Sequence, residues 1–501
     1  MDVNEKHSGE QLTPEELIDQ QGTVASTNKS QWERLWPVIA CGAGLFSDGY
    51  LNGVIGSVNT MLAMIYKKEY TSSPAQANVS SIAFAGTVVG QLFFGWTSDH
   101  FSRKWSLLVS TIILIVFAAL GAGSYGAGGS VSGLLAALTA YRFFLGIGIG
   151  GEYPAGSVGC AESTGELKAG TRNRWFALFT NVQIDFGFVV AAFVPMIVVL
   201  ATGENHLRAA WRICLGLGVI PPLSLLYLRI KLQEPEPFKR NSMSRVRTPW
   251  LLVIKFYWFR LAVVSAIWFM YDFSSYSFGI FSSALLTNLL GDNSELWVTF
   301  GWNTLLNFFY MPGCIPGAWL SDYLGPRKTL GYVVAIQGLF GFLFAGVYGY
   351  INQPRYVGAF VVMYGIFIAL GEAGPGNCIG MIASKTSATA VRGQYYGIAA
   401  AIGKIGAFAG NRVLLILYNK YADTDPTKAG QYPFFISSAM CLLSAALCLG
   451  FLPEIGQSVI DEEDAKFKSY LAANGFDISK MGVAPSESTE NIVESGKATE
   501  A

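Results

Sequence analysis

Long apolar stretches alternate with short polar connections along most of the chain. A stretch of about twenty apolar residues is the length that a helix needs to cross roughly 30 Å of hydrocarbon. About twelve such stretches can be placed, six before residue 231 and six after residue 256. They lie near residues 36–62, 79–99, 105–127, 132–153, 173–201, 210–230, 257–290, 296–321, 329–350, 355–383, 392–419 and 432–453. The pattern predicts an all-α membrane protein with twelve transmembrane helices.

A charged turn occurs twice, about half a chain apart. Residues 95–104 read GWTSDHFSRK, and residues 318–328 read AWLSDYLGPRK. Two matching sets of spans predict two pseudo-symmetric six-helix halves, the architecture of carriers whose halves rock around a central site. We expect Asp99 with Arg103, and Asp322 with Arg327, to act as a cytoplasmic gate. As ion pairs at the solvent edge, each is expected to contribute only about 0–1 kcal/mol.

Polar segments flank and separate the two halves. The expected parts are a disordered tail over residues 1–35, the N-terminal half over 36–230 and a linker outside the membrane over 231–256. The C-terminal half over 257–453 and a largely disordered tail over 454–501 follow. The tails are polar and carry too little apolar surface to fold alone. Lys and Arg gather on every second connection, including the linker, so that side and both termini are predicted to be cytoplasmic.

Composition narrows the classes of function. Of the 501 residues, 52% are hydrophobic and 14% are charged, and the formal net charge is zero, so no global field favours a nucleic-acid partner. The 7 cysteines lack the spacing of a metal site or a disulfide framework, and we interpret them as packing residues. The glycines between Gly146 and Gly151 lie inside an apolar span, where close helix packing accounts for them. Because the sequence contains no ATP motif, metal cluster or nucleophile–base pair, we expect no metal, no cofactor and no enzyme activity, with an ion gradient as the driving force.

Ionisable residues inside the apolar spans are the first candidates for function, because a charge at bilayer depth is costly unless it faces a cavity or a partner. They are Asp48, Arg142, Glu152, Asp185, Asp272, Glu372 and Lys404. Histidine is absent from the spans, so any proton that the protein carries must rest on carboxylates.

Two spans of the second half combine to suggest an anion site. Trp268, Asp272 and Tyr276 are spaced four residues apart, so they share one face of the seventh span. An aromatic packing stripe that includes an acid is the alternative interpretation. Lys404 is the lone cation of the eleventh span, and we expect it to pair with Asp272 or with an anionic substrate. A permanent bridge that only joins two helices is the alternative for this lysine.

These features resemble a known group of transporters. The twelve spans, the repeated turns and Arg142 with its glycine-rich fourth span look like the major facilitator superfamily over nearly all of residues 36–453. Four segments and Trp268/Asp272/Tyr276 resemble the phosphate:proton symporters: Ser47-Asp48-Gly49-Tyr50, Gly150-Gly151-Glu152-Tyr153-Pro154, Gly374-Pro375-Gly376-Asn377 and Gly403-Lys404. Four further segments are similar to the fungal glycerophosphoinositol and glycerophosphocholine permeases: Trp268-Phe-Met-Tyr-Asp272-Phe, Gly279-Ile-Phe-Ser-Ser283, Ala373-Gly-Pro-Gly376 and Ser387-Ala-Thr-Ala-Val-Arg-Gly393.

The resemblance implies roles for particular residues. The residues implied to hold the phosphoryl group are Tyr153, Trp268, Asp272, Tyr276 and Lys404. Those implied to serve the coupled proton are Asp48 and Glu152. The phosphate symporters carry Asp where this chain has Glu152, and their fifth-span Gln is out of register with Gln183. The fifth-span contact is therefore open, and Asn181, Gln183 or Asp185 is expected to meet the alcohol part of a phosphodiester. Further candidates are Arg142, Glu372 and Asn377.

The implied function is proton-coupled uptake of glycerophosphodiesters across the plasma membrane by alternating access. Its partners would be a small anionic phosphodiester, protons and the lipid bilayer, and the protein would work as a monomer. Proton coupling is expected because bringing a monoanion into a cell with a negative interior costs about 2.3 kcal/mol per 100 mV. Two alternatives stay open: an inorganic phosphate:proton symporter, and a non-transporting nutrient sensor whose tails recruit signalling partners. The sequence does not specify the head group.

Overall fold

The computed structural model describes residues 30–244, 246–291, 294–422, 424–456 and 459–482. These residues form helices and connecting turns, without a β-strand in the described ranges. Eleven helical stretches are long and apolar enough to cross a membrane. The eighth predicted span, which brings the number to twelve, is formed by two shorter helices that follow each other directly, α15 (Leu296–Phe308) and α16 (Tyr310–Tyr323). The predicted twelve-helix architecture in two halves is confirmed.

The first half comprises the helices before residue 231. Their bounds are α2 (Gln31–Gly42), α3 (Phe46–Tyr66), α4 (Lys68–Thr71), α5 (Ala75–His100), α6 (Arg103–Ala122), α7 (Val131–Gly151), η3 (Glu152–Ser157), α8 (Val158–Ser163), α9 (Arg172–Phe179), α10 (Asn181–Thr202), α11 (Leu207–Gly216) and α12 (Ile220–Ile230). A short helix, α13 (Glu236–Asn241), lies in the connection to the second half.

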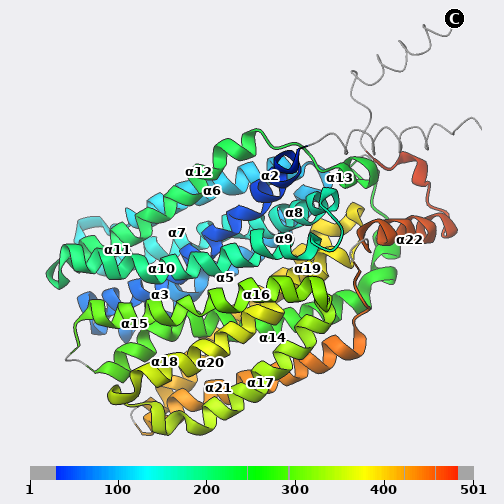
Figure 1. Ribbon diagram of the computed structural model, residues 1–501. Helices are drawn as coiled ribbons and strands as arrows, with labels where there is room; N and C mark the ends of the chain where they lie inside the picture. The colour runs from blue at the N-terminus through cyan, green and yellow to red at the C-terminus, as the bar shows by residue number, and fades with distance from the viewer. Residues whose placement is uncertain (1–29, 245, 292–293, 423, 457–458, 483–501) are drawn as a thin grey trace, which may run out of the picture.

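The second half begins with the longest helix of the described chain, and a last helix follows its final span. The bounds are α14 (Trp250–Leu290), α15 and α16 as above, α17 (Pro326–Ile351), α18 (Val357–Gly371), η8 (Glu372–Gly376), α19 (Asn377–Lys385), α20 (Arg392–Ala422), α21 (Pro426–Phe451) and α22 (Val459–Ala473). Figure 1 shows the two halves as two stacked groups of roughly parallel helices, the first half above the second.

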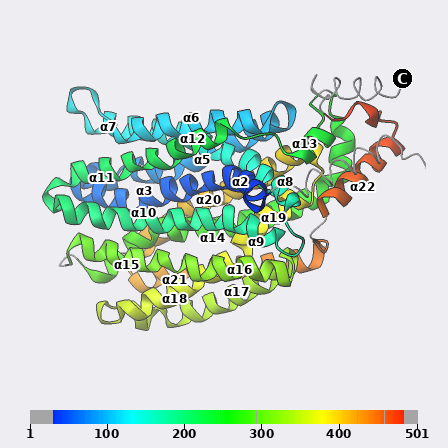
Figure 2. The ribbon, with the colours of Figure 1, turned by 45° about the horizontal axis from the view of Figure 1, so that its top comes forward.

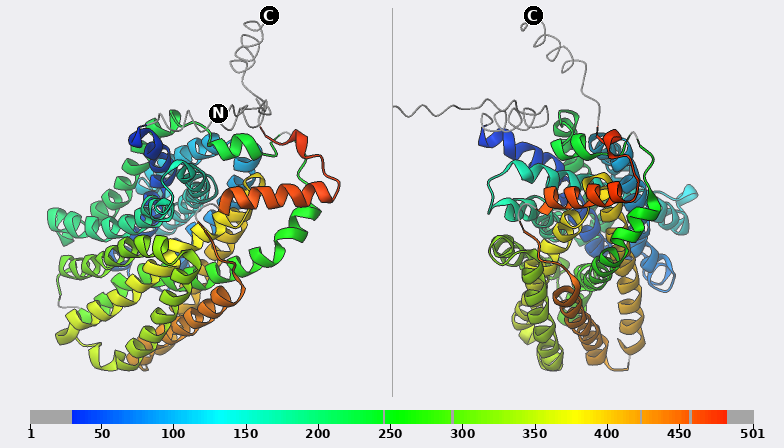
Figure 3. Two further views of the ribbon diagram at one scale, coloured as in Figure 1. Left: turned by 45° about the vertical axis from the view of Figure 1, so that its right-hand side comes forward. Right: turned by 90° about the vertical axis from the view of Figure 1, so that its right-hand side faces the viewer.

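One end of the bundle carries α13, α22 and the beginning of α2, and this arrangement is visible from every side in Figures 1, 2 and 3. We call it the basic end, since Arg103, Arg174, Arg327, Lys328 and Arg392 lie there, each at the start of a helix or within its first turns. The opposite end is formed by the last turns of α3, α14 and α20 and the first turns of α5 and α21.

Two predicted polar segments are more ordered than expected. The linker predicted over 231–256 contains α13, and α14 starts at Trp250 rather than at residue 257. The tail predicted to be largely disordered over 454–501 contains α22, whose Phe467 and Leu471 are buried. The Phe467 ring packs against Phe256 and Tyr257 of α14. The average composition of the tail hid this apolar stripe, which folds by docking rather than alone. The predicted tails 1–29 and 483–501 lie outside the described residues.

Glycines let α5 approach two helices very closely. A Cβ added at Gly86 or Gly90 would lie 1.9 Å from the Phe143 carbonyl oxygen or 2.2 Å from that of Ile147, both on α7. On the other side of α5, a Cβ at Gly397 of α20 would lie 2.5 Å from the carbonyl oxygen of Gln91. Since any side chain would clash, these glycines are required by helix packing, and α5 joins its own half to the other half.

An irregular turn interrupts one span of each half at matching places. The segments η3 and η8 are π-helical turns, and each starts with the glutamate of a Gly-Glu pair and contains a proline. Proline has no backbone N–H to donate, so it favours a widened turn of this kind. The turns place Tyr153 in the first half and Glu372 in the second at the contact between the halves.

Candidate functional site

A small cavity lies between the two halves near the middle of the bundle. The residues that line this central cavity come from both halves: Leu45, Tyr153, Ser157, Phe176, Thr180, Asn181, Ile184, Asp185, Phe188, Trp268, Tyr271, Asp272, Ser275, Tyr276, Glu372, Gly376, Ile379, Gly380 and Tyr396. Its free space is about 40 Å³, whereas pockets that hold small organic ligands usually measure roughly 300 Å³ or more. The structure is therefore an occluded state in which the halves are drawn together.

Lys404 and Asp272 form an ion pair beside this cavity. The Lys404 Nζ lies 3.2 Å from Asp272 Oδ2, and both side chains are 1% exposed, so the predicted pairing is confirmed. The ammonium also lies 3.5 Å from the ring centroid of Tyr276 and 4.8 Å from that of Tyr153. Beyond the ion pair, neither charged group has a hydrogen-bond partner among the described residues. The ammonium thus keeps hydrogen-bonding capacity for a ligand.

Asp48 joins the two halves through two phenols. Its Oδ2 accepts hydrogen bonds from the hydroxyls of Tyr153 and Tyr276, the second at 2.8 Å, and those two hydroxyls lie 2.8 Å apart. Asn52 Nδ2 donates to the other carboxylate oxygen at 2.5 Å. Asp48 and Tyr153 belong to the first half and Tyr276 to the second, so the contact closes the cavity on one side.

A second acidic group lies at another part of the cavity wall. Asn181 Nδ2 donates to both Asp185 Oδ2 and Glu372 Oε2, each at 3.1 Å. The Tyr271 hydroxyl donates to Glu372 at 2.7 Å and the Ser275 hydroxyl at 3.0 Å. The structure thus brings together two acids that are far apart in the sequence.

Glu152, in contrast, is held inside the first half. Arg229 NH1 and NH2 donate to its two carboxylate oxygens at 2.6 and 2.5 Å, and Ser110 adds a third hydrogen bond at 3.1 Å. Glu152 does not line the central cavity, although its neighbour Tyr153 does. The sequence-based choice of candidates missed Arg229, because it lies in the last turn of its span next to the basic linker. Its position inside an apolar span was the available signal.

Three other candidates contact the backbone instead of the cavity. Gln183 Nε2 donates to the Leu178 carbonyl at 3.2 Å. Asn377 Nδ2 donates to the Cys314 carbonyl at 2.7 Å, while its side-chain oxygen accepts from Asn181 at 3.4 Å. None of these side chains lines the central cavity, but Asn377 supports the group around Asn181.

The third, Arg142, lies closer to the opposite end. Its Nε donates to the Val79 carbonyl at 2.8 Å and its NH1 to the Leu51 carbonyl at 3.2 Å. Arg142 therefore ties α7 to α3 and α5 within the first half.

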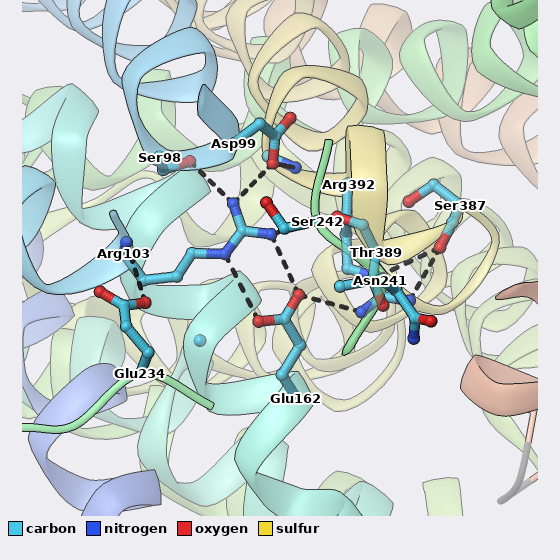
Figure 4. A network of polar contacts seen from close by, with 12 residues as sticks. Ser98, Asp99, Arg103, Glu162, Glu234, Asn241, Ser242, Ser387, Thr389 and Arg392 are labelled. Atoms are coloured by element: carbon cyan, nitrogen blue, oxygen red, sulfur yellow. Dashed lines mark hydrogen bonds and ion pairs between the residues drawn. The ribbon is translucent and has the colours of Figure 1, made fainter. Parts of the chain in front are cut away.

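Figure 4 shows the network that closes the basic end. Arg103 forms ion pairs with Asp99 at 2.6 Å and with Glu162 at 3.0 Å, and Glu162 also pairs with Arg392 of the second half at 3.0 Å. Asp99 accepts hydrogen bonds from the backbone N–H groups of Gly393 and Gln394 across the interface. Asp99 and Arg103 were predicted to pair at the solvent edge, but their side chains are only 1% and 0% exposed. Glu162, which sequence reasoning did not single out, provides the extra charge that permits their burial.

The second copy of the turn differs from the prediction. Asp322 does not pair with Arg327. Instead, its carboxylate lies 3.4 Å from Arg174 Nε in the first half and accepts from the backbone N–H of Asn173. Arg327 pairs with Glu454 at 3.1 Å. This copy of the turn contains Gly325-Pro326, and Gly325 has a φ of 80°. The altered turn separates the acid from the arginine.

A larger cavity of about 380 Å³ lies between the halves at the opposite end. Its polar lining consists of amides and hydroxyls: Asn59, Thr60, Gln76, Ser80, Thr287, Asn288, Tyr418 and Asn419. We call it the outer cavity. Thr60, which lines this cavity from the first half, lies in hydrogen-bond contact at 3.2 Å with Ser283 of the second half. The pathway is thus closed at the basic end and hollow at the other.

Comparison with known proteins identifies the family. The sugar (and other) transporter family matches residues 36–240 and 235–467. The chain belongs to this transporter family. Among solved structures, that of the major facilitator superfamily proton:xylose symporter XylE bound to 6-bromo-6-deoxy-D-glucose matches with a TM-score of 0.72 over 87% of this chain and 99% of that chain, at 16% identity. That likeness concerns the fold alone.

Two curated relatives of this transporter come from Candida albicans. "Glycerophosphocholine permease GIT4" is 48% identical over 95% of this chain and 88% of the relative. "Major glycerophosphoinositol permease GIT3" is also 48% identical, over 95% of this chain and 89% of the relative. The resemblance to fungal glycerophosphodiester permeases that the sequence motifs predicted is confirmed. The transporter is a permease relative and not an enzyme.

Proposed function

We propose that this transporter carries glycerophosphodiesters into the cell together with protons, by alternating access. The observation that carries the proposal is the buried Lys404–Asp272 pair at the contact between the halves, which keeps hydrogen-bonding capacity in a protein whose relatives are named as glycerophosphodiester permeases. A phosphodiester offers a single negative charge and oxygen acceptors. These match one ammonium and nearby hydroxyl donors.

In the proposed site, Lys404 attracts the phosphate, and the hydroxyls of Tyr153 and Tyr276 donate to its oxygens. Trp268, whose ring packs between Tyr153 and Tyr396, supplies a flat apolar wall. Asp272 holds the ammonium in place until the anion arrives. Because the occluded cavity is too small for a phosphodiester, the halves must separate before the substrate binds. Opening therefore precedes substrate binding in this scheme.

We propose that the basic end faces the cytoplasm of a cell whose plasma membrane holds the protein, with both termini on that side. The support is the concentration of Lys and Arg at this end. The outer cavity then faces outward, and its uncharged amides and hydroxyls suit the polyol part of an incoming substrate. Of the two acids that the resemblance assigned to the proton, Asp48 contacts the site through Tyr153 and Tyr276, whereas Glu152, bound to Arg229, is better suited to hold the first half together.

Uptake into proteoliposomes tests the substrate class. Under an imposed pH gradient, labelled glycerophosphoinositol or glycerophosphocholine is expected to accumulate, and inorganic phosphate is expected to compete weakly. Transport of phosphate without competition from either diester would favour the phosphate symporter instead. Absence of transport for all three, with an intact folded protein, would favour the sensor.

A further inference from the structure

Asp185 and Glu372 meet across the interface between the two halves. Asp185 lies on α10 of the first half and Glu372 on the π-helical turn η8 of the second, and each residue is 2% exposed. Their carboxyl groups share the Asn181 amide as a common donor, which lies 3.1 Å from one oxygen of each acid. Two ionised carboxylates only accept hydrogen bonds. Because one amide contacts both buried acids, two full negative charges would repel each other strongly there, and the arrangement favours one proton between them.

No cation neutralises this pair among the described residues. The titratable groups that face it are Tyr271 and Asp272 of α14 and Tyr310 and Cys314 of α16. None of these groups carries a positive charge. The nearest ammonium, on Lys404, is already paired with Asp272 at 3.2 Å. The charge of the acidic pair is thus controlled by protons alone.

The charge balance of the central cavity gives an independent reason to place a proton here. Asp185, Asp272 and Glu372 line the cavity, and Asp48 adjoins it through Tyr153 and Tyr276. Against these four acids stands one cation, Lys404. An anionic substrate adds a further negative charge to a closed and poorly hydrated space, where repulsion between like charges is strong. A proton that enters with the anion removes this cost.

We propose that the Asp185–Glu372 pair is the site of the coupled proton in this transporter, an inference that rests on the proposed function. With one shared proton, the pair carries a single negative charge while no substrate is bound. Binding of the anion favours a second proton, which forms an O–H bond on the remaining carboxylate and leaves both acids neutral. The net charge of the cavity is then the same whether it is empty or loaded.

The position of the pair explains how the proton leaves. Asp185 and Glu372 belong to different halves, so opening of the basic end moves them apart and admits water. The second O–H bond then breaks, its proton passes to water, and its electron pair stays on the carboxylate. The restored negative charge repels the substrate anion. Release of proton and substrate on the same side is what symport requires.

The decisive experiment uses a double variant in purified proteoliposomes. Asp185→Asn with Glu372→Gln gives an uncharged pair of nearly the same shape, which imitates the doubly protonated state. We expect exchange of labelled for unlabelled glycerophosphoinositol to persist without dependence on pH, whereas accumulation driven by a pH gradient falls by about tenfold or more. Glu69→Gln, the same chemical change at an exposed position, should leave both activities unchanged.

Accumulation that follows the pH gradient normally in the double variant would overturn the proposal. Loss of exchange in a well-folded double variant would also overturn it, since the pair would then bind the substrate itself. If the double variant does not fold, each single variant is measured for proton uptake on substrate binding in detergent, with a pH indicator. Uptake equal to that of the unaltered protein in both would refute the assignment. If the unaltered protein exchanges no glycerophosphodiester, the proposed function fails instead.

Discussion

Glu152 and Glu372 occupy matching places in the two halves, and their surroundings are opposite. Each follows a glycine and opens a π-helical turn that contains a proline. Glu152 is bound by the guanidinium of Arg229 within its own half, whereas Glu372 shares the Asn181 amide donor with Asp185 of the other half. The fold therefore accepts a cation beside this glutamate. The first half has this cation, so Glu152 and Arg229 form a fixed and neutral pair. The second half has no cation beside Glu372 among the described residues, so under our proposal the charge of this acid depends on a proton.

The largest effect is expected from breaking the neutral pair of the first half. Arg229→Met leaves the buried Glu152 without its cation, and loss of one partner of a buried ion pair costs about 3–5 kcal/mol of folding free energy. Thermal unfolding of the protein in detergent measures this loss. Combining it with Glu152→Gln should recover most of the stability. A single variant as stable as the unaltered protein would contradict the assignment of a structural role.

Removing the cation of the second half should affect transport more than stability. Lys404→Ala leaves Asp272 to repel the anion, and uptake of a glycerophosphodiester is expected to fall by about 100-fold, equal to roughly 2.7 kcal/mol of binding and transition free energy. Lys428→Ala, at an exposed position, serves as the control. Both proteins are compared at equal amounts in the membrane. Substantial uptake by Lys404→Ala would remove this lysine from the site.

The repeated turns allow the same comparison at the basic end. Asp99 is buried and bound by Arg103 and two backbone N–H groups, while Asp322 has a side chain that is 11% exposed. Asp99→Asn should raise the population of molecules open at this end by about tenfold, and Asp322→Asn should raise it by less. The rate at which a thiol reagent modifies the buried Cys160 on α8 reports the opening. Equal rates in the two variants would show that burial of the turn does not matter.

The smallest effect concerns α22, outside the membrane-spanning helices. Burial raises the pKa of Asp464 above its usual 3.8, although Arg392 opposes this effect. Docking of α22 therefore gains stability as the pH falls through the raised pKa towards the ordinary one, and loses it as the pH rises. Hydrogen exchange of α22, corrected for the intrinsic rate, should show more protection at mildly acidic than at neutral pH. Asp464→Asn should remove this difference, and an unchanged difference would assign it to another group.

The sequence predicts the fold well, because apolar runs reflect the thickness of the bilayer directly. It also predicts the Trp268, Asp272 and Tyr276 face and the Lys404–Asp272 pair, since helical spacing and the cost of a buried charge are local arguments. The partners of Asp322 and Arg327 could not be predicted, because the inserted Gly-Pro changes the direction of the turn. The helix α22 was missed since its apolar stripe packs on residues far away in the sequence, among them Phe256 and Tyr257 of α14.

The acidic partner of Glu372 shows the limit of such reasoning. Asp185 was a candidate from its depth in the fifth span, but nothing in the sequence specifies that it meets the tenth. That contact depends on how the two halves face each other, which no local pattern contains. The same holds for Glu162, whose two arginine partners come from different halves.

The glycines between α5 and α20 suggest how the halves can move at all. At Gly397 of α20 and Gly95 of α5, the nearest atoms across the contact are backbone atoms of the other helix. Surfaces that interdigitate have to change rotamers before they can shift, whereas two smooth ridges can slide with little activation cost. The contact between α5 and α20 would thus be the place where the two halves slide past each other during the rocking motion. Gly397→Ala would then be expected to slow the movement between open states, although the residues of the binding site stay in place.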